Sequence, residues 1–245
     1  SYPAAFDKLF FTLLSFARKV FRMQGRFLLR SSGSGPHAVQ VKVCGFTDEK
    51  NISSVASLPI DAAGFVLFRK SSRYVPSDRL DSLIRTLPDR VTPVLLFVNP
   101  DPDEVFAVTR RHPEVLLQFH GDETPEFCRA FGLPYMKAVH FEKPGDLLRA
   151  EARYPDAAAI LADCPAPDSG AAPGGNGTAF DWELARSEAA SLTLPLVLAG
   201  GLNAENAAAA YSLLHPAALD VSSGVEDSPG IKSRQKIHDF LGALR

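Results

Sequence analysis

Cysteine, methionine and tryptophan are scarce in this sequence of 245 residues, with three, two and one copies. The cysteines, Cys44, Cys128 and Cys164, are odd in number and far apart, and they form no CxxC pair and no Cys/His cluster with metal-ligand spacing. These absences argue against a disulfide framework and against a zinc module. We therefore expect a reduced, intracellular protein without a structural metal.

Long apolar runs and a strong net charge are also lacking. No apolar run approaches the roughly 20 residues of a membrane-spanning helix, so no transmembrane segment is expected. The net charge of −2 combines two parts of opposite sign, because residues 1–36 carry six basic side chains and one acidic one, and the remainder carries 20 basic and 27 acidic ones. The acidic body argues against nucleic-acid binding, which depends on neutralising many phosphates.

The basic N-terminal part has the pattern of an amphipathic helix. Apolar side chains from Phe6 to Phe21 recur at helical spacing, and residues 31–35 form a Ser/Gly linker. We expect residues 1–36 to be an extension and residues 40–245 to be the catalytic domain. The extension is predicted to dock on that domain, to bind a partner or a membrane surface, or to be the remnant of a targeting peptide. The expected location is the cytoplasm, or an organelle if the targeting interpretation holds.

From residue 41 onward, short β-rich runs alternate with helix-like segments. Strands that are apolar at consecutive positions, such as residues 93–98, are typical of a sheet covered on both faces. Eight such units predict an α/β fold, a single (β/α)8 TIM barrel, with a doubly wound open sheet as the alternative. The predicted strands are 41–45, 63–68, 92–98, 115–120, 136–140, 158–163, 195–199 and 218–222.

Two helix starts and one long connection are readable. Asp101 before Pro102 and Thr124 before Pro125 predict a capping side chain followed by proline at the first helical position. The connection from 164 to 179 is rich in Pro, Gly, Asp and Ser and is long for a βα loop. It is predicted to be a lid or a disordered insertion.

Two apolar runs near the C-terminus, residues 198–202 and 220–224, end in small residues and lie one βα repeat apart. Small residues let the backbone approach a ligand, and N–H groups at a helix start attract an anion. In β/α barrels the loops after the seventh and eighth strands often hold a phosphate. A phosphorylated small molecule is therefore expected to bind there, against Gly200, Gly201, Ser222, Ser223 and Gly224.

Five further side chains lie at or just after predicted strand ends: Cys44, Arg73, His120, Asp163 and Asp220. Active groups of a barrel occupy that end, so the set offers a base, an acid and a receptor for a carboxylate. Each has a structural alternative. Cys44 could be a core cysteine, Asp163 a turn cap, and Asp220 a buried ion pair. Arg73 could be merely solvated, and His120 a satisfied polar residue at the rim.

Taken in order along the chain, several segments resemble the phosphoribosylanthranilate isomerase family of tryptophan biosynthesis. The segments cover nearly all of residues 41–245, and residues 1–36 have no counterpart in the family pattern. They are VKVCGFT at 41–47, GFVLF at 64–68 with SRYV at 72–75, LQFHGDE at 117–123, GGNG at 174–177 with FDW at 180–182, AGGL at 199–202, DVSSGVE at 220–226 and SPGIK at 228–232.

The resemblance implies a cofactor-free Amadori rearrangement of an aldose amine to a ketose amine. It assigns the general base to Cys44 and the general acid to Asp163. Arg73 would bind the anthranilate carboxylate, and Asp220 would contact the substrate amine or orient Arg73. His120 is a further substrate-binding candidate. We expect cations such as Lys42 to lower the pKa of Cys44, and burial with a neighbouring phosphate to raise that of Asp163.

Two departures from the family pattern affect binding. Ser72 stands where the family has proline, so Arg73 is expected to be held more loosely. Thr178 stands where the glycine-rich loop usually carries lysine. Other functions stay open: another phosphate-binding sugar isomerase or epimerase barrel, or a scaffold that acts through its basic helix. The sugar isomerase would need paired aspartates on strands one and five, and strand one offers Cys44 instead.

Overall fold

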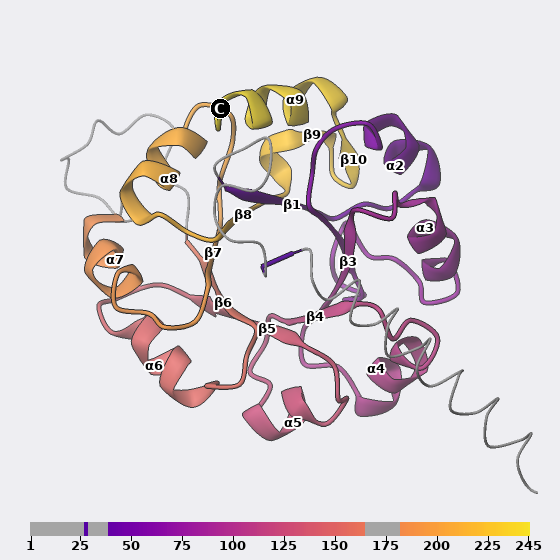
Figure 1. The fold of residues 1–245 in the computed structure, drawn as a ribbon. Helices are drawn as coiled ribbons and strands as arrows, with labels where there is room; N and C mark the ends of the chain where they lie inside the picture. Colours follow the sequence, from indigo (N-terminus) through magenta and orange to yellow (C-terminus); the bar gives the residue numbers. More distant parts are fainter. Residues whose placement is uncertain (1–26, 29–38, 165–181) are drawn as a thin grey trace, which may run out of the picture.

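A closed barrel of eight parallel strands forms the centre of the computed structural model, which describes residues 27–28, 39–164 and 182–245 (Figure 1). The strands follow chain order around the ring, and β1 pairs with β8 through Lys42 and Asp220 among others. This pairing excludes the open sheet. The strands are β1 (Gln40–Cys44), β2 (Ala62–Val66), β3 (Thr92–Phe97), β4 (Leu116–Phe119), β5 (Tyr135–His140), β6 (Ala159–Asp163), β7 (Leu196–Ala199) and β8 (Ala218–Val221).

Helices surround the ring, one after each strand, and cover its outer face (Figure 1). They are α2 (Glu49–Val55), α3 (Leu80–Thr86), α4 (Pro102–Thr109), α5 (Pro125–Arg129), α6 (Asp146–Arg153), α7 (Trp182–Ala189), α8 (Ala207–Leu214) and α9 (Arg234–Gly242). Between β8 and α9 the chain adds the 3₁₀ turn η1 (Ser223–Val225) and the antiparallel pair β9 (Glu226–Ser228) and β10 (Ile231–Lys232).

All eight predicted strands are confirmed, with ends that differ by no more than two residues. The predicted helix starts at Asp101 and Thr124 are confirmed as well. Asp101 Oδ1 accepts the N–H of Asp103 at 2.9 Å, and Thr124 Oγ1 accepts the N–H of Phe127 at 3.2 Å. These side chains satisfy N–H groups that a helix start otherwise leaves unpaired.

The barrel interior changes character along its axis. Toward the N-terminal ends of the strands, the interior is filled by small and medium apolar side chains, among them Ala62, Val94, Met136 and Ala218. A second, larger apolar cluster lies between the strands and the helices. Toward the C-terminal ends of the strands the interior becomes polar, with Lys42 and Asp220 both buried. The apolar end stabilises the ring, and the polar end is left for chemistry.

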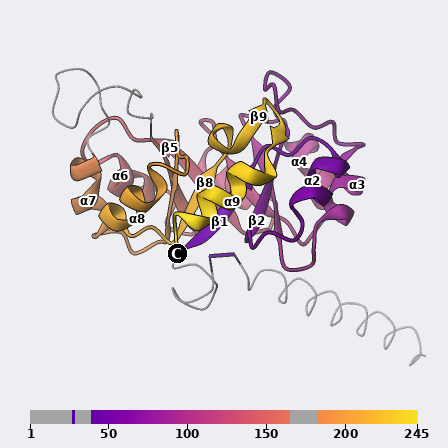
Figure 2. The ribbon, with the colours of Figure 1, turned by 90° about the horizontal axis from the view of Figure 1, so that it is seen from above.

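Phe27 and Leu28 belong to the interior apolar cluster. Phe27 is only 4% exposed, and the Leu28 N–H donates to Gln40 Oε1 at 2.6 Å. Figures 1 and 2 show this short segment on the barrel axis, at the end opposite β9. Two residues of the predicted extension therefore pack with the barrel.

The rest of that extension lies outside the described residues, as do the amphipathic helix predicted within it and the predicted lid or insertion at 165–179, including Thr178. Among the described residues, no helix has the length and apolar character that crossing a membrane requires.

Candidate active site

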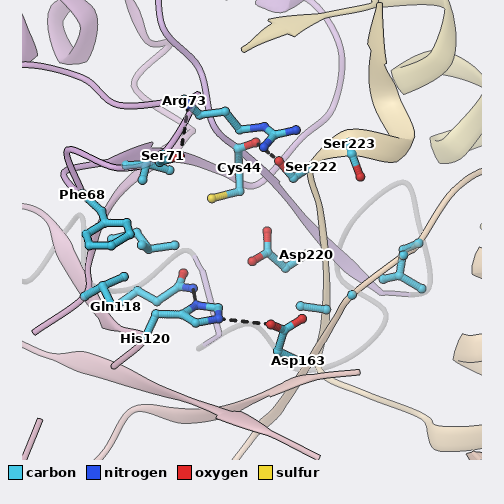
Figure 3. A pocket seen from close by; sticks show the side chains of 17 residues that line it. Cys44, Phe68, Ser71, Arg73, Gln118, His120, Asp163, Asp220, Ser222 and Ser223 are labelled. Carbon is cyan, nitrogen blue, oxygen red and sulfur yellow. Dashed lines mark hydrogen bonds and ion pairs between the residues drawn. The ribbon is translucent and has the colours of Figure 1, made fainter. Parts of the chain in front are cut away.

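A cavity of about 310 Å³ opens at the C-terminal ends of the strands (Figure 3). Nine of the ten predicted site residues line it. They are Cys44, Arg73, His120, Asp163, Gly200, Gly201, Asp220, Ser222 and Ser223. Segments more than a hundred residues apart in the chain therefore meet around one space, as the barrel prediction required. Gly224 is the exception, because it is not among the lining residues.

Cys44 ends β1 and is only 6% exposed, yet it lines the cavity. Gly64 on β2 makes room for it, since a Cβ at that position would lie 2.6 Å from Cys44 Sγ. Burial raises the pKa of the Cys44 thiol, and the nearby Lys42 and Lys232 oppose that rise without cancelling it. Lys42 thus acts in the predicted direction, but desolvation outweighs it and the net pKa of Cys44 is raised.

Lys42 and Asp220 form a buried ion pair across β1 and β8, with Lys42 Nζ 2.6 Å from Asp220 Oδ2. Burial acts to lower the pKa of Lys42, but the charges of Asp220 and Cys44 raise it overall. Because Asp220 pairs with Lys42, it does not orient Arg73, which was one of the two roles predicted for Asp220. Its other oxygen, Oδ1, is buried without a hydrogen-bond partner among the described residues.

Asp163 ends β6 and contacts histidines from two other strand ends. His120 Nε2 lies 3.2 Å from Asp163 Oδ2, and His140 Nδ1 lies 3.6 Å from the same oxygen. Burial acts to raise the pKa of Asp163, but the hydrogen bond and charge of His120, together with His140, hold it below its ordinary value. Burial thus acts in the predicted direction, but the histidines outweigh it and favour the carboxylate.

Gln118 completes this row, with its Nε2 atom 3.2 Å from His120 Nδ1 (Figure 3). Because an amide nitrogen can only donate, His120 Nδ1 accepts in this arrangement and His120 Nε2 carries the proton toward Asp163. His120, whose role the sequence left open, is therefore a direct neighbour of the proposed acid.

Arg73 binds Glu226 through two parallel hydrogen bonds, Nε to Oε1 at 2.8 Å and Nη2 to Oε2 at 2.6 Å. The main chain before it is also fixed, because the Arg73 N–H donates to Ser71 Oγ at 3.1 Å. Arg73 is therefore held at its main chain and at its guanidinium, with serine at position 72. Gly45 adds to this order, since a Cβ there would lie 2.5 Å from Arg73 Cδ.

Glycines allow the loops after β6, β7 and β8 to pack closely, backbone against backbone. Gly200 has a φ of +94°, and a Cβ at this position would lie 1.7 Å from the Cys164 carbonyl oxygen. A Cβ at Gly224 would lie 1.9 Å from the Leu202 carbonyl oxygen. Gly224 thus lets the loop after β8 pack on the loop after β7, while Gly200, Gly201, Ser222 and Ser223 face the cavity.

Five residues of this site were not singled out as site residues from the sequence: Gly64, Gln118, His140, Glu226 and Lys232. Four of them lie inside or beside segments that resemble the family. The sequence motifs therefore contain these residues but do not indicate what each one does. The motifs also do not show which side chains contact one another. Nothing in the order of the chain says that Glu226 meets Arg73, 153 positions earlier.

Comparison with known proteins agrees with this geometry. The family model for N-(5'phosphoribosyl)anthranilate (PRA) isomerase matches residues 41–243. The N-(5'-phosphoribosyl)anthranilate isomerase of Acidithiobacillus ferrooxidans is 42% identical over 207 residues, which span 84% of this chain and 98% of the relative.

Two solved structures are similar over 84% of this chain and 98% of their own. Phosphoribosyl anthranilate isomerase from Thermotoga maritima is 35% identical, with a TM-score of 0.74. A phosphoribosyl anthranilate isomerase in complex with reduced 1-(o-carboxyphenylamino)-1-deoxyribulose 5-phosphate is 33% identical, with a TM-score of 0.73. With its barrel, its cavity and these relatives in agreement, the chain belongs to the phosphoribosylanthranilate isomerase family.

Proposed function

We propose that this cavity isomerises N-(5-phosphoribosyl)anthranilate to 1-(2-carboxyphenylamino)-1-deoxyribulose 5-phosphate, with Asp163 as general acid and Cys44 as general base. The observation that carries the proposal is that the buried thiol and the carboxylate line the same cavity, together with Arg73 and the small-residue loops (Figure 3). No cofactor is needed, because the reaction only moves protons within one substrate.

Two proton transfers make up the proposed reaction. Protonated Asp163 gives its proton to the ribose ring oxygen as the C1–O bond breaks, which leaves a protonated Schiff base between C1 and the anthranilate nitrogen. The Cys44 thiolate then takes the proton from C2, and the electron pair of that C–H bond forms the C1–C2 double bond of an enolamine. The enolamine tautomerises to the ketone. Each proton-transfer group of this kind contributes about 10²–10⁴ in rate.

Three contacts would hold the substrate for these steps. The N–H groups and hydroxyls around Gly200, Gly201, Ser222 and Ser223 suit the phosphate. Arg73 suits the anthranilate carboxylate, because a guanidinium matches a carboxylate in shape and charge. The unpartnered Oδ1 of Asp220 suits the substrate amine, whose N–H would satisfy it.

The pKa directions of Asp163 and Cys44 mean that the bound substrate must change the protonation state of each group. Asp163 starts as a carboxylate and must gain a proton, which the nearby substrate phosphate would promote by raising its pKa. Cys44 starts as a thiol and must lose its proton to solvent before it can act as a base. The cationic Schiff base that forms after ring opening would lower the thiol pKa at the moment when a base is required.

The remaining assignments follow from the family. The relatives compared above include bacterial enzymes, which favours a cytoplasmic location over an organelle. The alternative of another sugar isomerase or epimerase loses its support because the family is established over residues 41–243. That match does not cover the basic helix through which the alternative scaffold would act. A partner-binding, membrane-surface or docking role for residues 1–36 stays a prediction.

Replacing Asp163 with Asn tests the acid assignment. The introduced amide keeps a hydrogen-bonding group beside His120 but cannot deliver a proton, so kcat should fall about 10²–10⁴-fold with little change in KM. Substrate consumption followed by fluorescence gives both constants. Asp239→Asn, an exposed change on α9, is the matched control. Turnover of Asp163→Asn near that of the control would contradict the assignment.

A further inference from the structure

Glu226, the first residue of β9, lies buried between two cationic side chains. It is 8% exposed and receives both hydrogen bonds of the Arg73 pair. Lys232 Nζ donates to Glu226 Oε1 at 2.6 Å, and the Gly230 N–H donates to the same oxygen at 3.1 Å. A single carboxylate therefore links the arginine at the cavity to the short β9–β10 pair.

The Glu226 contact fixes the far end of Arg73. Gly45 and the Ser71 hydroxyl hold the stem and main chain of Arg73, while Glu226 holds the guanidinium. A guanidinium has five N–H bonds, and Glu226 takes two of them. The others are left on the Nη side to meet a ligand in an orientation that is already set before binding.

Lys232 compensates for the negative charge of Glu226. Glu226 alone would neutralise Arg73 and repel a substrate carboxylate, whereas Arg73, Glu226 and Lys232 together carry one net positive charge. Lys232 is itself held firmly, because its N–H donates to Asn51 Oδ1 at 2.8 Å and its carbonyl accepts from Asn51 Nδ2 at 2.7 Å. The cluster is thus both rigid and cationic.

We propose that Glu226 is a positioning residue that makes Arg73 selective for the aryl carboxylate of the substrate, with Lys232 as its charge partner. The proposal rests on the carboxylate-binding role of Arg73 given above. Preorganisation of this kind lowers the cost of ordering a long side chain on binding. Its effect should therefore appear in KM, and only for substrates that carry the carboxylate.

The test compares N-(5-phosphoribosyl)anthranilate with N-(5-phosphoribosyl)aniline, which lacks the carboxylate. Glu226→Gln should raise KM for the anthranilate about tenfold, with kcat changed less than about threefold, and leave both constants for the aniline nearly unchanged. Glu226→Asp, which keeps the charge on a shorter side chain, should give a smaller rise for the anthranilate alone. Glu49→Gln removes the exposed Arg79 pair and is the matched control.

A second arm separates the two proposals. Arg73→Met should raise KM for the anthranilate alone, and adding Glu226→Gln to Arg73→Met should change nothing more. An equal effect of Glu226→Gln on both substrates, or an additive effect in the double variant, would overturn the role of Glu226. If Arg73→Met instead fails to distinguish the substrates, the carboxylate-binding role of Arg73 is wrong, and the role of Glu226 fails with it.

Discussion

At Cys44 and Asp163, burial and neighbouring charges act in opposite directions on the same group. At Cys44 the effect of burial is the larger one, and it raises the thiol pKa despite two nearby lysines. The opposite holds at Asp163, where burial opposes the histidines but they lower the carboxyl pKa. These directions favour a thiol and a carboxylate, so the proposed roles require the substrate to supply the charges that reverse both.

The residue types and their places at strand ends were predictable from the sequence, and their pKa directions were not. Lys42 alternates onto the face of Cys44, which suggested a cation that lowers the thiol pKa. The sequence does not show that Asp220 on β8 forms an ion pair with Lys42 on β1. It also does not show how completely the Cys44 thiol is buried. Such a balance depends on distances among residues that are remote in the chain.

Individual secondary structure elements were the most predictable level of the molecule. The caps at Asp101 and Thr124 work because a short oxygen-bearing side chain and a following proline act within one turn. The same locality explains why β9 and β10 were missed. They are three and two residues long, and their pairing has an irregular register that no local sequence pattern indicates.

His112, between α4 and β4, joins these elements to α3, and we expect its protonation to stabilise their packing. Its Nε2 atom lies 2.7 Å from Asp81 Oδ1 on α3, and Glu114 lies on its other side. Hydrogen bonds with Glu114 and Asp81 raise the His112 pKa above its ordinary 6.5, against the effect of burial. The protonated form is therefore favoured in the folded state.

The resulting stability should be fully present below pH 6.5 and be lost as the pH rises through the higher folded-state pKa. Because Asp81 is 37% exposed, the loss should stay below about 1 kcal/mol. Urea unfolding of wild type and His112→Gln across pH 5.5–8.5 measures it, with roughly those limits chosen to bracket the transition. A pH-independent difference between the two proteins would contradict this account.

For the molecule as a whole, the barrel followed from counting eight βα units, but the boundary of its core did not. Phe27 lies ahead of the family match at residues 41–243 and still packs into the apolar end of the barrel. Small interior residues such as Ala62 and Ala218 lie in the same cluster. A Ser/Gly-rich segment separates Phe27 from β1, so the sequence pattern indicated a boundary where the packing is continuous.

Phe27→Ala should lower the free energy of unfolding by about 3 kcal/mol, because a buried ring is lost from a packed interior. The turnover number should be unchanged, since Phe27 belongs to the apolar interior cluster and is not among the residues that line the cavity. Urea unfolding checks this, with the exposed Leu148→Ala on α6 as control, where about 0.5 kcal/mol or less is expected. Equal effects of the two changes would mean that Phe27 contributes nothing to the core.

The central claim is the proposal that Cys44, in its thiolate form, removes the proton from C2 of the substrate. Its most direct test is kcat for Cys44→Ala on N-(5-phosphoribosyl)anthranilate, compared with Cys128→Ala, which removes another buried free thiol away from the cavity. We expect Cys44→Ala to lose about 10²–10⁴ in kcat with little change in KM, and Cys128→Ala to keep nearly all of its activity. Turnover by Cys44→Ala within a few-fold of Cys128→Ala would contradict the claim.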